Sequence, residues 1–160
     1  MDEKRKLVVG ITGASGVILG IRLLECLRSE DVETHLVLSS AAQATIRHET
    51  NWKICDVVAL ADHCYEHSDI SAPIASGSFP ISGMVVLPCS IKTLSAIANS
   101  YASDLIARAA DVSLKEGRPL ILVVRETPLH SGHLRLMELA ARSGAVIFPP
   151  IPVFYGWPKN

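Results

Sequence analysis

The sequence predicts a doubly wound α/β fold, a three-layer structure in which helices cover both faces of a parallel sheet. Short aliphatic runs alternate with longer amphipathic stretches, and glycine, proline or small polar residues separate them. Parallel neighbours need long right-handed crossovers, so this alternation favours a parallel sheet over an antiparallel one. The length of 160 residues fits one domain.

The first half begins with a strand, a glycine turn and a helix. An aliphatic run at residues 6–11, too short for a helix, leads through TGASG into residues 17–28. Apolar residues in that second stretch recur at three- and four-residue steps, which places them on one helix face. We expect a second strand at 33–38 and a second helix at 41–49.

The middle of the chain has a poor pattern from residue 51 to 82, with a short helix expected near 57–62. Loops of this length in compact domains are usually functional or mobile. The later elements are clearer and end at glycine or proline signals. We expect strands at 83–88, 119–124 and 145–148, helices opened by SIKT and at 105–116 and 133–143, a break near 100–104, and a loop from 149 onward.

Composition excludes several classes of partner. Of the residues, 49% are hydrophobic, 5% are aromatic and 19% are charged, with a net charge of −1. A disordered chain is excluded, and no broad positive field exists to hold nucleic acid or an anionic membrane. No aliphatic run approaches the ~20 residues of a membrane-spanning helix. The apolar excess on a small domain favours a homo-oligomer.

The cysteines and the N-terminal segment predict a cytoplasmic protein. Glycines interrupt any apolar core in MDEKRKLVVGITGASG, so we expect no signal peptide. The four cysteines form neither a C-x-x-C pair nor a metal-ligand spacing, which is typical of thiols in a reducing compartment.

The polar signals follow the predicted strands, so they are expected to gather at the carboxyl edge of the sheet. Gly10, Gly13 and Gly16 surround the first turn, where backbone N–H groups and a helix N-terminus could hold a phosphate. The spacing is not the dinucleotide G-x-G-x-x-G, and Ser39 and Ser40 stand where a nicotinamide enzyme offers a carboxylate. A mononucleotide or flavin fits better than NAD, although glycines in such turns are also common without any ligand.

Other polar residues are less specific by themselves. Ser90 and Thr93 in PCSIKT could donate hydroxyls to an anion, with Lys92 adding charge, or could simply cap a helix. Arg125 and Glu126 follow a strand and could point into a crevice or form a surface ion pair. Glu49, taken alone, is typical of a solvated helix face.

The six histidines do not predict a metal site. His130 and His133 lie three residues apart near Glu126, but His35 falls in a strand and the others scatter along the chain. No catalytic triad is evident either, because Ser15 lacks the G-x-S-x-G pattern. We therefore expect no metal.

Several motifs taken together resemble those of the UbiX-type flavin prenyltransferases, a family that includes components of phenolic-acid and aromatic-acid decarboxylase systems. The resemblance runs from Leu7 to Pro158. It is carried by TGASG, LSSAAQATIRHET, IASGSF, MVVLPCSIKTLSAIA, LIARAADVSLKEGRPLILVVRETPLH and GAVIFPPIPVFY. It implies a Rossmann-like fold of the flavoprotein type, and transfer of a dimethylallyl group from dimethylallyl monophosphate to reduced FMN. The prenylated FMN would serve a separate UbiD-type decarboxylase.

The resemblance also implies roles for individual residues. Ser15 and Glu49 would form a proton relay, and Glu126 would join them as a catalytic residue. The substrate-binding residues would be Arg108, supplied across a subunit boundary, Lys115, Glu126 and Tyr155. FMN would contact Gly13, Ala14, Ser15, Ser39, Ser90, Ile91, Lys92, Thr93 and Arg125. The family also implies a dodecamer.

Two departures from the family pattern accompany the resemblance. We expect one FMN-binding domain over residues 1–160 without the family's C-terminal helix, and therefore weaker binding of the prenyl donor. Asp69, Ile70 and Ser71 stand where some relatives have a tryptophan. Two other functions remain open, a non-catalytic FMN-binding accessory subunit and a flavin-dependent cysteine decarboxylase.

Overall fold

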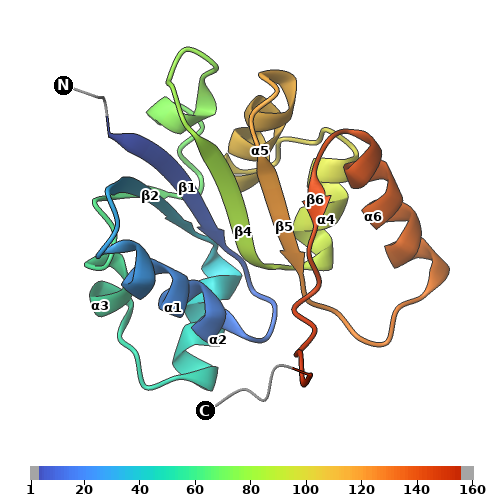
Figure 1. The fold of residues 1–160 in the computed structure, drawn as a ribbon, viewed down its shortest axis with the longest axis horizontal. Helices are drawn as coiled ribbons and strands as arrows, with labels where there is room; N and C mark the ends of the chain where they lie inside the picture. The colour runs from blue at the N-terminus through green and yellow to red at the C-terminus, as the bar shows by residue number, and fades with distance from the viewer. Residues whose placement is uncertain (1–3, 156–160) are drawn as a thin grey trace.

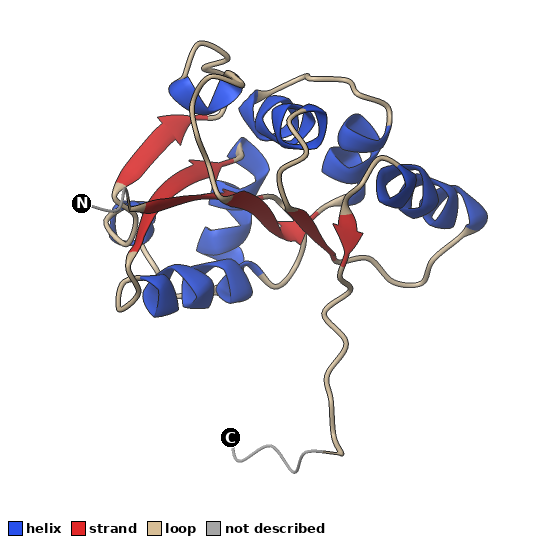
Figure 2. Ribbon diagram, turned by 45° about the horizontal axis from the view of Figure 1, so that its top comes forward, coloured by secondary structure: helices blue, strands red, loops and turns tan. Residues whose placement is uncertain are grey.

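The computed structural model describes residues 4–155, which form a six-stranded parallel sheet between two layers of helices (Figures 1 and 2). The strand order is β3-β2-β1-β4-β5-β6, and every neighbouring pair is parallel. The predicted doubly wound α/β fold is confirmed. The strands are β1 (Arg5–Ile11), β2 (Val32–Leu38), β3 (His63–Glu66), β4 (Gly83–Cys89), β5 (Leu120–Val124) and β6 (Val146–Ile147).

The helices lie on two faces of the sheet, and each face has its own cluster of buried apolar side chains. One cluster joins α1 (Val17–Leu27), α2 (Ser40–Glu49) and α3 (Ile54–Val58) to the sheet. The other joins α4 (Ile91–Ala98), α5 (Leu105–Lys115), α6 (Ser131–Arg142) and the short 3₁₀ helix η1 (Pro73–Ala75). Two separate cores, one on each face, explain why the strands read as almost continuous aliphatic runs.

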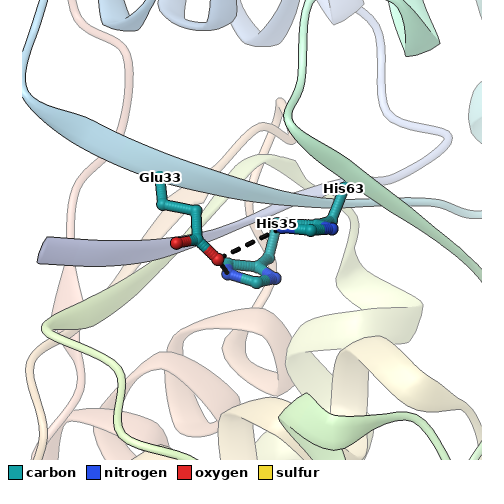
Figure 3. Close-up of side chains that lie close together, drawn as sticks. All are labelled: Glu33, His35 and His63. Atoms are coloured by element: carbon teal, nitrogen blue, oxygen red, sulfur yellow. Dashed lines mark ion pairs between the residues drawn. The ribbon is translucent and has the colours of Figure 1, made fainter. Parts of the chain in front are cut away.

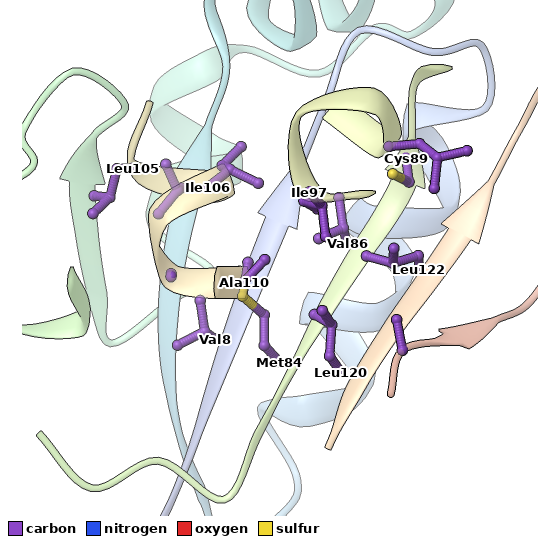
Figure 4. Close-up of a cluster of buried hydrophobic side chains, with 14 of the residues drawn as sticks. Val8, Met84, Val86, Cys89, Ile97, Leu105, Ile106, Ala110, Leu120 and Leu122 are labelled. Atoms are coloured by element: carbon purple, nitrogen blue, oxygen red, sulfur yellow. The ribbon is translucent and has the colours of Figure 1, made fainter. Parts of the chain in front are cut away.

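The core behind α4 and α5 is made of close-packed aliphatic side chains from helices and strands (Figure 4). Ile106 and Ala110 of α5 lie over Val8 of β1 and Met84 of β4. Gly10 of β1 leaves room for this helix, because an added Cβ would come within 3.2 Å of Ile106.

The sequence missed one strand, and its expected total of five strands is wrong. β3 has four residues, HCYE, and pairs with β2 at one edge of the sheet. Three of those residues are exposed, so no apolar alternation marks the strand. The expected short helix near 57–62 lies earlier in the chain, at Ile54–Val58.

The other expected elements are present with shifts of one or two residues at their ends. The break predicted near 100–104 separates α4 from α5, and Asp104 caps α5 by accepting a hydrogen bond from the Ala107 N–H at 2.9 Å. Of the tail expected to be a loop, residues 149–155 have no regular structure, and 156–160 lie outside the described residues. Among residues 4–155 no helix has the length and apolar character needed to cross a membrane.

The chain reverses its direction of winding between β1 and β4. The crossover from β1 leads to β2 on one side, and the crossover from β3 returns to β4 on the other. The loops after β1 and β4 therefore diverge and leave a crevice at the carboxyl edge, which is where ligands bind in such sheets.

A buried threonine joins these two loops. The Thr12 hydroxyl donates to the Pro88 carbonyl at 2.7 Å and accepts from the Ser90 N–H at 2.8 Å. The Thr12 side chain is 1% exposed, so water cannot replace either bond.

We predict that Thr12→Val, which keeps the side-chain shape but removes the hydroxyl, lowers the free energy of unfolding by about 1 to 3 kcal/mol. The reason is that the Ser90 N–H loses its acceptor in a buried position. Urea denaturation followed by circular dichroism measures the change. Thr12→Ser keeps the hydroxyl and is the matched control; equal losses in the two variants would contradict the prediction.

Candidate functional site

The crevice contains a cavity of about 400 Å³ formed by the loops after β1, β2 and β4. A second cavity of about 490 Å³ adjoins it and shares His67, Lys92 and Asp104 with it. The joined space has room for a ligand that extends across both cavities. The first cavity is lined by Thr12, Gly13, Ser39, Ser40, Ala41, His67, Ser90, Lys92, Thr93 and Asp104.

Glycine brings the loop after β1 into contact with α2. A Cβ added to Gly13 would lie 2.4 Å from the Ala41 Cβ, which no real contact allows. Gly16, at the start of α1, has a φ of 94°, a conformation that glycine adopts without strain. The loop can therefore lie flat against α2 and expose its backbone to the cavity.

The last turn of α2 places Glu49 against the same loop. Its Oε2 accepts a hydrogen bond from the Gly16 N–H at 2.8 Å. A hydrogen bond from the Ser15 side chain is the main reason that the pKa of Glu49 is lowered, and the nearby Arg125 charge adds to the effect. Glu49 is therefore a carboxylate near neutral pH, with the Ser15 hydroxyl as its donor.

The structure thus joins Ser15 and Glu49, which the residues by themselves did not predict. Glu49 was expected on a solvated helix face, and its side chain is indeed exposed. Only the family resemblance paired it with Ser15, across 34 positions of sequence.

Two helix N-termini face the cavity, those of α2 and α4. Ser39 Oγ accepts from the Ala42 N–H at 3.0 Å, and Ser90 Oγ accepts from the Thr93 N–H at 3.3 Å. Both serines therefore act as helix caps, which was the simpler of the two interpretations. Capping uses the N–H of the third helical residue, and the first two N–H groups of each helix are the ones that could meet an anion.

The segment around Ser90 also presents the other residues expected there. Lys92 and Thr93 line the cavity, and Ile91 is the first residue of α4. Cys89 lies next to them but is fully buried, and burial raises the pKa of its thiol to about 12. The Cys89 thiol therefore stays protonated and is no nucleophile at neutral pH.

Arg125 and Glu126 follow β5 at the same edge of the sheet. The Arg125 N–H donates to the Cys89 carbonyl at 3.1 Å, which fixes the segment beside the loop after β4. Glu126 Oε1 accepts from the Thr127 N–H at 3.0 Å. Both side chains are exposed, so their charged groups are available to a ligand at the rim.

Three expected substrate-binding residues do not reach the cavity within one chain. α5 runs from the carboxyl edge, where the Leu105 N–H donates to the His67 carbonyl, to the opposite edge, where Lys115 lies beside Gly77. Arg108 Nε donates to the Ala75 carbonyl at 3.1 Å on the outer side of α5. Tyr155 lies in the tail and is 90% exposed.

The sequence did not point to His67 and Asp104, although both line the two cavities. Asp104 carried a usable signal, because an aspartate directly before an apolar helical run is a typical N-cap. His67 follows β3, the strand that the sequence analysis missed. Without that strand, nothing in the sequence places His67 at the carboxyl edge of the sheet.

Comparison with known proteins identifies the family of this chain. Residues 1–151 match the family model described as Flavoprotein. The chain is 60% identical to the flavin prenyltransferase UbiX of Salmonella typhimurium (strain LT2) over 157 residues, which cover 98% of this chain and 83% of that protein.

Two solved structures are similar over nearly the whole chain. One is the crystal structure of AnUbiX (PadA1) in complex with FMN and dimethylallyl pyrophosphate, with a TM-score of 0.97 and 52% identity over 99% of this chain and 84% of that one. The other is the dodecameric FMN-dependent Ubix-like decarboxylase from Escherichia coli O157:H7, with a TM-score of 0.94 and 51% identity over 97% and 84% of the two chains.

Proposed function

The chain belongs to the UbiX-type flavin prenyltransferases within the flavoprotein family, and we propose that it transfers a dimethylallyl group from dimethylallyl monophosphate to reduced FMN. The observation that carries the proposal is the cavity at the switch point, which two helix N-termini and Gly13 line, with the Ser15–Glu49 pair further along the same glycine loop. The product would supply a UbiD-type aromatic-acid decarboxylase.

The residues around the cavity fit FMN. Gly13 leaves no space for a side chain, so the loop after β1 would present the backbone of Gly13, Ala14 and Ser15 to the flavin. Ser39 would contribute from the start of α2. The flavin phosphate would lie at the N-terminus of α4, among Ser90, Ile91, Lys92 and Thr93, with Arg125 at the rim.

Cationic side chains would assist departure of the donor's phosphate. Breaking the allylic C–O bond releases inorganic phosphate and leaves a cation-like carbon. Reduced FMN would supply N5 and C6 as the two ring atoms to which the dimethylallyl group becomes joined. Arg125 would stabilise the charge growing on the phosphate, and the cavity walls would align the two reactants.

Ser15 and Glu49 would move a proton during the later ring-closing step. The Ser15 hydrogen bond lowers the pKa of Glu49, which is therefore a carboxylate that accepts this bond and could take the hydroxyl proton only as Ser15 receives another one. Ser15 would in turn take a proton from the flavin side, so the pair acts as a relay. Glu126, at the same rim, would be the second carboxylate of the site.

The prenyl-phosphate pocket would be completed by neighbouring copies of the chain. Lys115 lies at the opposite edge of the sheet from the cavity, and Arg108 and Tyr155 also lie outside it. If all three bind the donor's phosphate, they must come from other subunits. The E. coli O157:H7 relative is described as dodecameric, and a dodecamer is the assembly that we propose. The four unpaired cysteines favour the cytoplasm as its compartment.

We predict that the purified protein, given reduced FMN and dimethylallyl monophosphate without oxygen, forms a flavin heavier by one C5 prenyl unit. Mass spectrometry of the extracted flavin measures it. Bound FMN without turnover would instead support the accessory subunit, and turnover of a C-terminal cysteine peptide would support the cysteine decarboxylase.

Ser15→Ala and Glu49→Gln should each lower the rate of prenyl-flavin formation by about 10²-fold or more, the usual scale for a lost proton-transfer group. FMN affinity should change much less, because other loops hold the cofactor. Single-turnover absorbance and fluorescence titration measure the two quantities. Ser29→Ala and Glu25→Gln, both remote from the cavity, are the controls; an unchanged rate in Ser15→Ala and Glu49→Gln would remove the relay.

We also predict that two inactive variants, Ser15→Ala and Lys115→Ala, regain activity when their subunits are mixed and reassembled. If each site takes Ser15 from one chain and Lys115 from another, a site is intact where the Lys115→Ala chain supplies Ser15 and the Ser15→Ala chain supplies Lys115. Sites built within a single chain would stay defective in both. Activity of the mixture that equals the average of the separate variants would contradict a shared site.

A further inference from the structure

A short segment, residues 75–79, runs from the end of η1 toward β4 and touches two cationic side chains of α5 that are expected to bind the donor's phosphate. The Ala75 carbonyl accepts a hydrogen bond from Arg108 Nε at 3.1 Å. Two residues further on, Gly77 lies against the end of the Lys115 side chain. Arg108 and Lys115 are seven positions apart on α5, so they lie on one face of that helix. One segment therefore contacts both cations.

The end of α5 directs Arg118 toward this segment. Gly117 has a φ of 65°, and its N–H donates to the Leu114 carbonyl at 3.1 Å. The Arg118 N–H donates to the Ser113 carbonyl at 2.8 Å, which completes the Schellman motif that commonly ends a helix. The backbone of Arg118 is therefore fixed relative to α5.

The Arg118 guanidinium makes two hydrogen bonds to the segment. Nη1 donates to the Phe79 carbonyl at 2.8 Å, and Nη2 donates to the Gly77 carbonyl at 2.7 Å. A planar guanidinium can meet two carbonyls in a fixed geometry, which a lysine ammonium cannot do. The Phe79 side chain packs against the core behind α4 and α5. The segment is thus held by a packed side chain and by two backbone carbonyls.

Gly77 leaves the space in which the Lys115 ammonium lies. A Cβ added to Gly77 would lie 2.9 Å from Lys115 Nζ and closer still to Glu116 Oε1. Lys115 and Glu116 form an ion pair, but their side chains are 49% and 34% exposed. A pair of that kind contributes little by itself, while a lysine loses much rotamer freedom when it is held in one place. The fixed segment adds the surface on which Lys115 lies.

We propose that Gly77 and Arg118 are positioning residues, which hold the Lys115 ammonium where it would meet the donor phosphate of a neighbouring copy. The inference rests on the proposed function, in which Lys115 binds that phosphate. Gly77 and Arg118 would not touch the donor and would act through Lys115. A cation that is already in place loses less conformational freedom on binding, so the donor is bound more tightly.

Isothermal calorimetry with dimethylallyl monophosphate tests the proposal on the chain loaded with oxidised FMN, where no transfer occurs. Gly77→Ala and Arg118→Ala should each raise the Kd of the donor about fivefold or more, because the charged contact is no longer held ready. Arg118→Lys, which can keep one of the two carbonyl bonds, should raise it less. Gly77 has no positive φ, so alanine adds its methyl group without backbone strain.

Two controls accompany this measurement. Arg22→Ala removes an exposed arginine on α1 and should leave the Kd of the donor unchanged. The Kd of FMN should stay within about twofold in every variant, because the segment does not line the FMN cavity. A donor Kd that is the same in Gly77→Ala, Arg118→Ala and the unaltered chain would overturn the proposal.

A cycle of double variants separates positioning from damage to the fold. In a chain that already carries Lys115→Ala, adding Gly77→Ala or Arg118→Ala should change the Kd of the donor by less than about twofold, because the residue through which both act is gone. If the single effects multiply instead, Gly77 and Arg118 do not act through Lys115.

Amine labelling follows Lys115 without any donor. Acetylation by an active ester, measured by mass spectrometry of the peptides, should modify Lys115 at least about twofold faster in Gly77→Ala and Arg118→Ala, because an ammonium held beside a carboxylate is the less reactive form. The exposed Lys4 serves as internal reference. An unaltered chain that binds no donor would contradict the proposed function, whereas equal labelling of Lys115 in all chains would overturn the positioning.

Discussion

The hydroxyl of Thr12 is the contact on which the geometry of the candidate site depends. The β1–β4 pairing ends at Gly10 and Val86, and beyond it the two loops diverge because the crossovers leave in opposite directions. Thr12 holds the loops together past that point: its backbone N–H and its hydroxyl both donate to the Pro88 carbonyl, and the buried hydroxyl accepts from the Ser90 N–H. The start of α4 is thereby held at a set distance from the glycine loop, and the cavity between them keeps its shape.

Much of the fold could be predicted because its signals are local. A buried parallel strand is an aliphatic run, and a helix covering it shows a periodic apolar face, so β1, α1, β4 and β5 were found within one or two residues. β3 could not be found this way, because HCYE is short and three of its four side chains are exposed. Its strand conformation comes from pairing with β2, which is a tertiary contact that a local pattern does not contain.

The candidate site was predictable to a smaller extent, for the same reason. Glycines and hydroxyls at strand ends mark the loops around the cavity, but they do not say which side chains meet. Glu49 reaches Gly16 only because α2 packs beside α1, and the residues alone placed it in solvent. The sequence also did not show that His35 and His63 lie side by side (Figure 3), since the β2–β3 register aligns residues 28 positions apart.

The division of the expected site between two edges of the sheet links activity to assembly. In a doubly wound domain every helix runs antiparallel to the strands, so a side chain at the end of a helix such as α5 cannot reach a cavity at the carboxyl edge. Lys115 can serve the cavity only of another copy. The tail after β6 fits this requirement, because Ile151, Phe154 and Tyr155 are more than 70% exposed. An apolar segment of that kind is stable in water when another surface covers it. The contacts that bury the tail and those that bring Lys115 to a flavin would then form together, so an isolated subunit would hold FMN and Arg125 but would lack Arg108 and Lys115 for the prenyl phosphate.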